Sequence, residues 1–234
     1  MHDDDRPDAL IVLAGSDGQL RLAPKNHSIW TERYRPRTIA ECVLPSALKK
    51  PLQNYVDKGG GPHLLLVGPP GVGKSTVARA IAHELRWYML VANGAIHATV
   101  SALRGDIAEH VSAGASLYQQ HGGLLLDEAD QLKSAAQVGL LGLMEDYDRY
   151  CTIIFCTNYP ENISAAIKSR CRTFIFDYET EPARSEMFEG FRTRLREILA
   201  AEDVECPDRI LEDRINRCWP DFRQVLNLLQ SEVT

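Results

Sequence analysis

The hydrophobic positions of this chain form short, nearly continuous runs that alternate with longer amphipathic stretches from His63 onward. Such runs are typical of strands covered on both faces, as in a parallel sheet. Five runs are expected to be strands: residues 63–68, 87–94, 123–130, 151–158 and 173–177. The stretches between them are expected to be helices, chiefly residues 74–85, 101–120 and 134–147. This alternation predicts an α/β fold in which a five-stranded parallel sheet lies between helices.

The pattern changes at both ends of the chain. After Tyr178, three helical stretches follow one another without a strand: residues 179–202, 206–217 and 220–230. They predict a small three-helix domain over residues 179–234, joined to a main domain over residues 29–178. Residues 1–28 stand apart as an N-terminal extension, in which two short apolar segments flank GSDG and predict a hairpin. In the simpler interpretation this hairpin extends the edge of the main domain; in the other it is a partner-binding arm.

Composition and charge narrow the class of protein. Of the 234 residues, 44% are hydrophobic, as in an ordinary globular protein. No apolar run approaches the ~18 residues of a membrane span, so no membrane partner is expected. The acidic start, MHDDDRPD, is unlike a secretory signal, and the six scattered cysteines contain no C-x-x-C pair. We therefore expect a cytoplasmic protein with reduced thiols. The net charge of −6 argues against coating nucleic acid through bulk charge but is compatible with a local basic surface.

A phosphate-binding motif follows the first predicted strand. GPPGVGKS, residues 68–75, matches G-x-x-x-x-G-K-[ST] and opens a predicted helix, which is the context that the motif requires. Its glycines let successive backbone N–H groups turn toward phosphates, Lys74 supplies charge for the β- and γ-phosphates, and the Ser75 hydroxyl can bind Mg²⁺. The motif predicts a nucleoside triphosphate site; a purely structural glycine-rich turn is the weaker interpretation.

Polar residues end two further predicted strands. Asp127 ends the apolar run GLLLD, where its carboxylate can hold Mg²⁺, and Glu128 is the candidate for polarising the attacking water. Asn158 ends the next run and could contact the γ-phosphate or the water, although Asn at a strand end is usually a turn former. Arg170 precedes the last run, and its rigid fork of donors suits a phosphate.

Together these motifs resemble AAA+ ATPases, because the order P-loop, DEAD, TN, SRC and a helical module with DFR is the order of that family. WTERYRP at 30–36 and SRC at 169–171 resemble the small ATPase subunits of sliding-clamp loaders. YRPRTIAECVLP and PDFRQ are most similar to the clamp-loader subunits of tailed bacteriophages. The resemblance covers roughly residues 29–234 and implies a P-loop AAA+ base domain followed by a three-helix lid domain.

The resemblance implies roles for individual residues of an ATP hydrolase that uses ATP and Mg²⁺. Catalytic roles fall to Glu128, Lys74, Asn158 in the base domain, Arg223 in the lid, and Arg170 as an arginine finger acting in trans on a neighbouring subunit. Ser75 and Asp127 would hold Mg²⁺. Asn93 matches a position that can hold the catalytic glutamate idle until DNA arrives. The implied nucleotide-binding residues are Tyr34, Arg35 and Pro36 at the adenine end and Gly68, Pro69, Pro70, Gly71, Val72, Gly73, Lys74, Ser75, Thr76, Asn93, Asn158 and Arg223.

The same resemblance implies partners: other clamp-loader subunits in a homo- or hetero-oligomer, expected to be a pentameric spiral, a sliding clamp and primer–template DNA. A phage-encoded chain would act in the host cytoplasm. Arg104 and Lys133 are candidates for DNA phosphate contacts, although each is more often an ordinary solvated charge. The family's helical collar domain is expected to be absent, because the sequence stops at Thr234.

Two alternatives to a DNA-dependent clamp-loading ATPase stay open. One is another AAA+ enzyme, either a branch-migration motor or a protein remodeller, although AIHATVSALRG lacks the aromatic residue of an unfoldase pore loop. The other is a non-catalytic nucleotide switch that serves assembly. The complete set of Lys74, Asp127, Glu128 and Asn158 argues against that switch.

Overall fold

A single sheet of seven strands organises the molecule, with the strand order β2-β1-β4-β5-β6-β3-β7. The computed structural model describes residues 11–14, 20–22, 29–95, 105 and 121–233. The five predicted strands are all present and are parallel to one another. Their bounds are β3 His63–Val67, β4 Tyr88–Asn93, β5 Gly122–Asp127, β6 Cys151–Thr157 and β7 Cys171–Ile175. Numbered one to five along the chain, these strands lie in the order 2-3-4-1-5.

Two short N-terminal strands extend this sheet beyond β4. Strand β1 (Ile11–Ala14) pairs antiparallel with β2 (Leu20–Leu22) and parallel with β4. This is the hairpin at the edge of the main sheet, the simpler of the two interpretations of the N-terminal extension.

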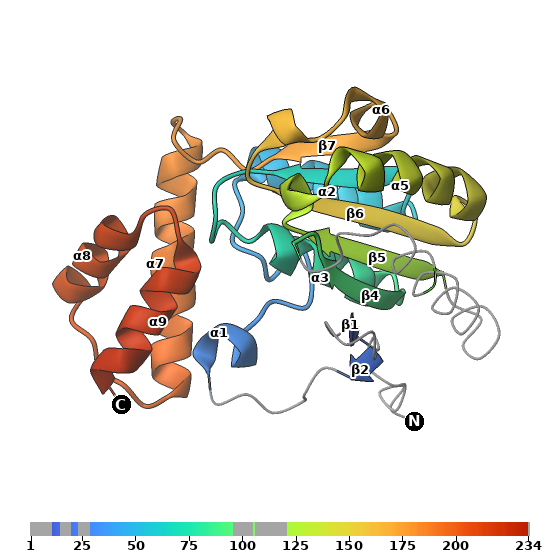
Figure 1. The fold of residues 1–234 in the computed structure, drawn as a ribbon. Coiled ribbons are helices and arrows are strands. Elements are labelled where there is room, and N and C mark those ends of the chain that lie inside the picture. Colours follow the sequence, from blue (N-terminus) through green and yellow to red (C-terminus); the bar gives the residue numbers. More distant parts are fainter. Residues whose placement is uncertain (1–10, 15–19, 23–28, 96–104, 106–120, 234) are drawn as a thin grey trace.

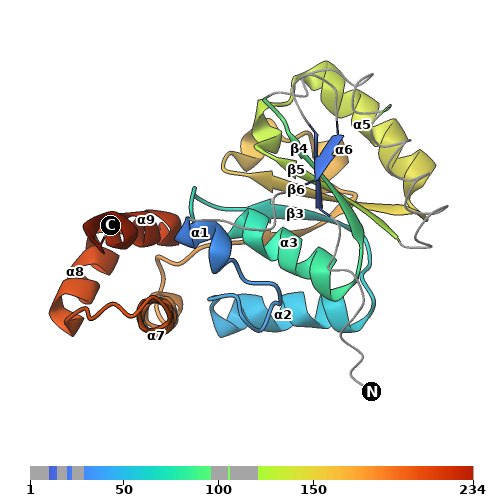
Figure 2. The same ribbon diagram turned by 90° about the horizontal axis from the view of Figure 1, so that it is seen from below.

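Helices cover both faces of the sheet, which explains why its central strands β3, β4, β5 and β6 are nearly continuous in apolar residues, whereas the edge strand β7 is largely exposed (Figure 2). On one face lie α2 (Ser46–Asp57) and α3 (Lys74–Glu84); on the other lie α5 (Ser134–Tyr147) and the short α6 (Ala165–Lys168). Helices α3 and α5 confirm the sequence prediction, whereas α2 was not predicted. The expected helix over residues 101–120 falls outside the described residues except for Gly105.

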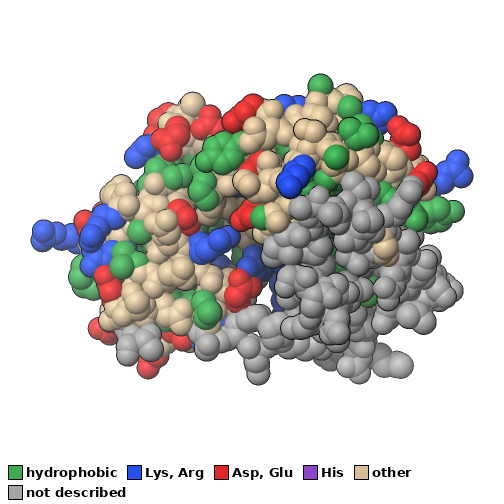
Figure 3. Space-filling model, in the orientation of Figure 1, with side chains coloured by type: hydrophobic (Ala, Val, Ile, Leu, Met, Phe, Trp, Pro, Cys, Tyr) green, Lys and Arg blue, Asp and Glu red, His purple; other side chains and the backbone are tan. Residues whose placement is uncertain are grey.

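Three C-terminal helices form a second layer beside the sheet domain (Figure 1). They are α7 (Ala183–Ala201), α8 (Asp208–Cys218) and α9 (Phe222–Val233), as the three helical stretches predicted. Acidic and basic side chains are interspersed over them (Figure 3), and several arginines form ion pairs, including Arg192–Glu189 at 2.7 Å and Arg196–Asp208 at 2.6 Å. This pairing leaves little net positive charge on these helices.

The segment of residues 29–46, which we call the strap, joins the two layers. It begins with α1 (Trp30–Arg33), whose Trp30 N–H donates to Gln230 Oε1 of α9 at 2.9 Å. Further on, Ser46 N–H donates to Glu186 of α7 at 2.6 Å. Gly190 of α7 lies so close to the strap that an added Cβ would approach Val43 Cγ1 to 2.5 Å. The strap therefore fixes how closely the C-terminal helices approach the sheet domain.

The six cysteines are free thiols. Burial raises the pKa of Cys42, Cys151 and Cys171 to about 12, so these side chains are poor nucleophiles and behave as small apolar residues. Among the helices that the structure describes, none combines the length and apolar character that a membrane crossing requires.

Candidate nucleotide-binding site

The P-loop connects β3 to α3 at the carboxyl edge of the sheet. Gly71 and Gly73 adopt positive φ angles of 77° and 95°, a left-handed conformation that only glycine adopts without strain. Gly73 is the N-cap of α3 and carries no side chain that could satisfy the free N–H groups of the first turn. Those N–H groups and the positive end of the helix dipole form a binding site for an anion.

Lys74 is buried and directed back across the loop. Its ammonium donates to the carbonyl oxygens of Gly68 at 2.8 Å and Pro69 at 2.7 Å, and to Asn158 Oδ1 at 2.8 Å. Burial lowers the pKa of Lys74, and the nearby charge of Arg223 adds to this lowering against the opposing carboxylates of Asp127 and Asp130. The structure thus brings together Lys74 and Asn158, which are 84 residues apart.

Asn93 contacts Glu128 at the ends of the neighbouring strands β4 and β5. Asn93 pairs with Asp127 in the sheet, and its Nδ2 donates to Glu128 Oε2 at 3.1 Å. The amide orientation is fixed because Ala95 N–H donates to Asn93 Oδ1 at 2.8 Å, which leaves the NH₂ group to face the carboxylate. A Cβ on Gly94 would lie 2.4 Å from the Glu128 carbonyl oxygen, so this close approach of the two strand ends requires glycine.

Asp130 is a buried carboxylate whose part in the site the sequence did not reveal. It accepts hydrogen bonds from Thr157 Oγ1 at 2.8 Å and from the Asn158 N–H at 3.2 Å. Burial alone would raise the pKa of Asp130, but bonds from Thr157, Gln131 and Asn158 outweigh it, so the net shift is downward. Asp130 stays ionised and holds the end of β6, which positions Asn158 against Lys74.

Ser75 and Asp127 provide the donor set that Mg²⁺ prefers. A hydroxyl from the first turn of α3 and a carboxylate from the end of β5 both lie at the carboxyl edge of the sheet. Among the described residues there is no cluster of three or more His, Cys, Asp or Glu side chains that could form an all-protein metal cage. Mg²⁺ usually binds through one or two carboxylates together with substrate phosphates and water, so this sparse set fits the ion.

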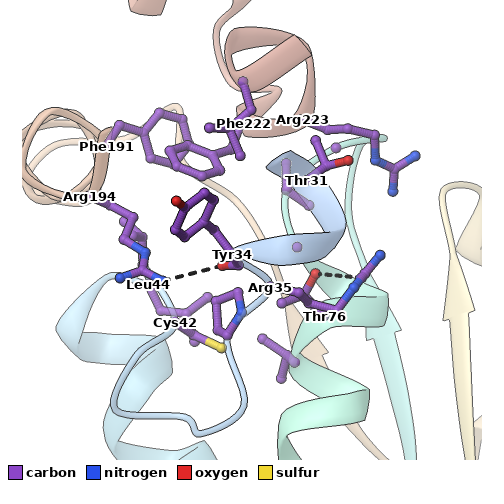
Figure 4. Close-up of a pocket in the computed structure, with 17 residues that line it drawn as sticks. Thr31, Tyr34, Arg35, Cys42, Leu44, Thr76, Phe191, Arg194, Phe222 and Arg223 are labelled. Carbon is purple, nitrogen blue, oxygen red and sulfur yellow. Dashed lines mark hydrogen bonds between the residues drawn. The ribbon is translucent and has the colours of Figure 1, made fainter. Parts of the chain in front are cut away.

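A pocket between the strap, the P-loop and the C-terminal helices lies beside the phosphate site (Figure 4). Phe191 of α7 and Phe222 of α9 meet with their ring centroids 4.7 Å apart, and Tyr34 lies below them in the view. The residues that line the pocket are Thr31, Tyr34, Arg35, Pro36, Cys42, Val43, Leu44, Gly71, Val72, Gly73, Thr76, Val77, Phe191, Arg194, Phe222, Arg223 and Leu226. An apolar, aromatic pocket next to an anion site suits the base of a nucleotide.

Tyr34 links this pocket to the C-terminal helices. Its hydroxyl donates to Glu202 just beyond α7, and Arg33 Nη1 contacts the same carboxylate oxygen at 2.6 Å. The hydrogen bond to Glu202, followed by burial, raises the pKa of Tyr34. The bond from Tyr34 outweighs the opposing effect of burial and, together with the bond from Arg33, lowers the pKa of Glu202. Arg194 Nη2 donates to the Tyr34 carbonyl at 3.3 Å, and Arg35 Nη1 donates to Thr76 Oγ1 at 3.2 Å.

The predicted site residues divide into those that converge here and those that do not. Tyr34, Arg35, Pro36, the P-loop, Asn93, Asp127, Glu128, Asn158 and Arg223 surround the site. Arg170 lies elsewhere, because it precedes β7 and Cys171 pairs with His63 at the start of β3. The P-loop follows the other end of β3, so roughly 15 Å of strand separates the two. Lys133 is exposed at the N-cap of α5, and Arg104 lies outside the described residues.

Sequence reasoning missed several residues of the base pocket. Thr31 and Phe222 lie inside the motifs WTERYRP and PDFRQ, so the motifs themselves were a signal that could have identified them. Phe191 and Arg194 lie in the middle of a long amphipathic helix, and no local pattern distinguishes them from its other residues.

Comparison with known proteins agrees with this geometry. Residues 64–177 match the family described as "ATPase family associated with various cellular activities (AAA)", and the chain therefore carries an AAA ATPase domain. It is related to two groups of replication proteins. It is 34% identical over 208 residues to the replication factor C small subunit of Staphylothermus marinus (87% of this chain, 61% of the relative). It is also 34% identical over 210 residues to the sliding-clamp-loader large subunit of Enterobacteria phage T4 (88% of this chain, 65% of the relative).

A solved structure has the same fold. The Thermotoga maritima RuvB Holliday junction branch migration motor superposes with a TM-score of 0.67 at 25% identity, over 84% of this chain and 64% of that chain. The chain spans less than two thirds of the length of these relatives.

Proposed function

We propose that this chain is a DNA-dependent ATPase subunit of a sliding-clamp loader, which uses ATP binding and hydrolysis to load a polymerase clamp onto primer–template DNA. Its relatedness to replication factor C small subunits and to a phage clamp-loader subunit supports this function. In this proposal residues 29–178 are the AAA+ base domain, residues 179–234 the lid, and residues 1–28 an N-terminal extension that contributes β1 and β2. The chain works in the cytoplasm, or in the host cytoplasm if a phage encodes it.

The chemistry is hydrolysis of the γ-phosphate of ATP. Backbone N–H groups of the P-loop and the Lys74 ammonium bind the phosphates, and Ser75 and Asp127 hold Mg²⁺, which neutralises charge on the phosphate oxygens when bound. Glu128 accepts a hydrogen bond from the attacking water and orients it. Asn158, which already contacts Lys74, and Arg223 of the lid complete the set around the γ-phosphate.

The contact between Asn93 and Glu128 corresponds to an idle state. The carboxylate that must orient the water is instead engaged by the Asn93 amide at 3.1 Å. Release of Glu128 from this contact when DNA binds would start hydrolysis. Lys133 and Arg104 remain candidates for the phosphate contacts that sense the DNA.

The position of Arg170 is the observation that carries the proposed assembly. Arg170 lies at the edge of the sheet opposite to the P-loop of its own chain, so it can serve only a nucleotide bound to another chain. When active sites are completed between subunits, hydrolysis depends on correct assembly. In this proposal the chain assembles with other clamp-loader subunits, like or unlike itself, in a pentameric spiral, and the spiral binds the clamp.

Mixing two inactive variants tests this arrangement. Lys74→Ala removes the phosphate ligand, and Arg170→Ala removes the finger; each alone is expected to lower ATP turnover by ~10³ or more. In a one-to-one mixture, a Lys74→Ala chain supplies Arg170 to the intact pocket of an Arg170→Ala neighbour. About a quarter of the interfaces then have the productive order, because head-to-tail joints form at random. Recovery toward that fraction of wild-type turnover is expected, whereas a mixture as inactive as its components would contradict the proposal.

The kind of DNA that stimulates ATP turnover distinguishes the proposed clamp loader from a branch-migration motor. We expect primer–template DNA to raise turnover per chain more than a four-way junction of equal length does. The RuvB likeness supports a common fold at 25% identity, whereas the replication relatives are 34% identical. Stronger stimulation by the four-way junction would favour the motor.

A further inference from the structure

Arg170 is engaged within its own chain although it is an exposed residue. Its Nη1 donates to the Ala166 carbonyl at 3.0 Å, and its Nη2 donates to Glu145 Oε1 of α5 at 2.9 Å. The relative exposure is 42% for the Arg170 side chain and 63% for that of Glu145. Both outer nitrogens of the guanidinium are thus attached to acceptors from two different helices.

Both acceptors belong to well-anchored elements. Helix α5 buries Leu143 and Met144, the residues next to Glu145, against the sheet. Helix α6 buries Ile167, and its N-cap residue Ser164 donates its N–H to Gln137 Oε1 of α5 at 2.8 Å. Helix α5 therefore holds the α6 segment near its start through Gln137 and at its end through Glu145 and Arg170.

We propose that Glu145 is a positioning residue for Arg170, which holds the finger in the orientation in which it meets the phosphate of a neighbouring chain. This inference rests on the proposed function, in which Arg170 acts in trans. A guanidinium has five N–H donors in a rigid plane, and Ala166 and Glu145 use two of them. The remaining three lie in the same fixed plane and are available for phosphate oxygens.

The contact with Glu145 orients the Arg170 side chain but does not prevent it from binding a phosphate. An ion pair between two side chains this exposed is screened by water and contributes little net attraction. A phosphate can bind through the N–H groups that Ala166 and Glu145 do not use, so Glu145 does not compete with it for the same donors. The contact instead restricts the rotamers of a long, flexible side chain before the neighbour arrives, and such pre-orientation raises the rate of the chemical step.

A double-mutant cycle in the assembled, ATP-hydrolysing protein tests the proposal. The variants are Glu145→Ala, Glu145→Gln and Arg170→Ala, and each Glu145 variant combined with Arg170→Ala. Steady-state hydrolysis over a titration of ATP gives kcat and KM, and single-turnover hydrolysis with the protein in excess over ATP isolates the chemical step of slow variants. Glu161→Gln, at an exposed carboxylate of the 3-10 turn Pro160–Asn162 just before α6, is the matched control.

Glu145→Ala is expected to lower kcat about threefold with KM for ATP unchanged, because only the placement of the finger is lost and an exposed pair restricts it modestly. Glu145→Gln keeps an acceptor oxygen and is expected to retain more activity. In the Arg170→Ala background neither substitution should lower kcat further, and Glu161→Gln should leave it unchanged.

An unchanged or raised kcat in Glu145→Ala would overturn the positioning role, and so would a loss of equal size in the Arg170→Ala background, which would indicate a general structural effect. An Arg170→Ala variant with wild-type turnover is a separate result. It would overturn the proposed function, and the positioning role with it.

Discussion

The phosphate end and the base end of the nucleotide site are built in different ways. At the phosphate end, Lys74, Asn93, Glu128 and Asn158 lie within a residue or two of strand or helix termini. They form two hydrogen-bonded pairs, Lys74–Asn158 at 2.8 Å and Asn93–Glu128 at 3.1 Å. The base end is assembled from the strap, the P-loop, α7 and α9, and two of its three aromatic residues, Phe191 and Phe222, come from helices outside the sheet domain. The sheet therefore fixes the chemistry, whereas the base end depends on how closely the C-terminal helices approach it.

The largest effect is expected at the phosphate end, where one substitution should lower kcat without weakening ATP binding. Glu128→Gln keeps the shape and the contact with Asn93 but removes the charge that, in the proposed function, orients the water. We expect kcat for ATP hydrolysis to fall by ~10²–10⁴ with ATP affinity retained, because loss of a general base costs about this much. Single-turnover hydrolysis and binding of a fluorescent ATP analogue measure the two quantities.

Asn93→Ala is the matched variant on the other side of the same contact. It removes the amide that engages Glu128, so the turnover of the protein without DNA should rise and its stimulation by DNA should shrink. A Glu128→Gln variant that hydrolyses ATP at the normal rate would show that another residue prepares the water.

The contact between α7 and the strap gives a smaller effect at the base end. Gly190→Ala places a methyl group 2.5 Å from Val43 Cγ1, and overpacking of this kind costs about 1–3 kcal/mol. The better helix propensity of Ala offsets at most about 1 kcal/mol of that cost. Denaturant unfolding should show a net loss of stability, and KM for ATP should rise while kcat at saturation changes little.

A second substitution checks the cause of this effect. Val43→Ala makes room for the methyl group, so the double variant should be more stable than the sum of the two single effects predicts. Strict additivity would mean that Gly190 is tolerant of a side chain and that the strap adjusts elsewhere.

Mild acid is expected to lower the stability of the sheet, through two histidines, before it affects the contacts of the base end. Burial lowers the pKa of His63 below 6.5, against weaker opposing effects of Asp148 and a Met144 backbone bond, and burial likewise lowers the pKa of His121. His63 Nδ1 accepts from Ile153 N–H at 3.1 Å, so the neutral ring carries its proton on Nε2. The unfolded chain binds protons first, so stability is complete above pH 6.5 and falls as the pH drops below that value, by at most about 1.4 kcal/mol per pH unit for each histidine.

The carboxylates that bond the strap to the α7 region become protonated only at a lower pH than the histidines. The pKa of Glu186 is lowered from 4.5 by its bonds from Ser46, and that of Glu202 by its bond from Tyr34, so the stability that they contribute is lost only below pH 4.5. Unfolding measured between pH 7 and 5 therefore reports the histidines. His63→Asn, which keeps an acceptor for Ile153 N–H, should flatten the slope; an unchanged slope would contradict this assignment.

The smallest effect concerns the bond between Tyr34 and Glu202. Glu202→Gln removes the charge that Arg33 and Tyr34 share but keeps an acceptor oxygen, and exposed contacts of this type contribute little. KM for ATP is expected to rise by about twofold with kcat unchanged. Glu205→Gln, at an exposed carboxylate nearby in the chain, is the control. A loss of kcat in Glu202→Gln would show that the base end also influences the chemical step.

The sequence predicted the phosphate end better than the base end. The residues of the phosphate end belong to short motifs at the ends of apolar runs, whereas those of the base end come from segments that are far apart in the chain. Strands buried on both faces leave continuous apolar runs, and the phosphate site lies where those runs end. Helix α2 was missed although Leu48, Leu52, Tyr55 and Val56 form a buried helical stripe, because Pro51 lies inside it and ordinarily breaks a helix. Phe191 and Arg194 of the base pocket, and Asp130 beneath Asn158, acquire their roles only through tertiary packing.

Because Arg170 and the P-loop lie at opposite edges of one sheet, the number of complete active sites depends on whether the assembly is closed or open. On the proposed role of Arg170, chains join head to tail, so that each joint is heterologous and completes one site. A closed ring of n chains has n complete sites, whereas an open spiral has n−1, with one unserved pocket at one end and one unused arginine at the other. In an open assembly of identical chains, position alone therefore makes one subunit catalytically different from the rest.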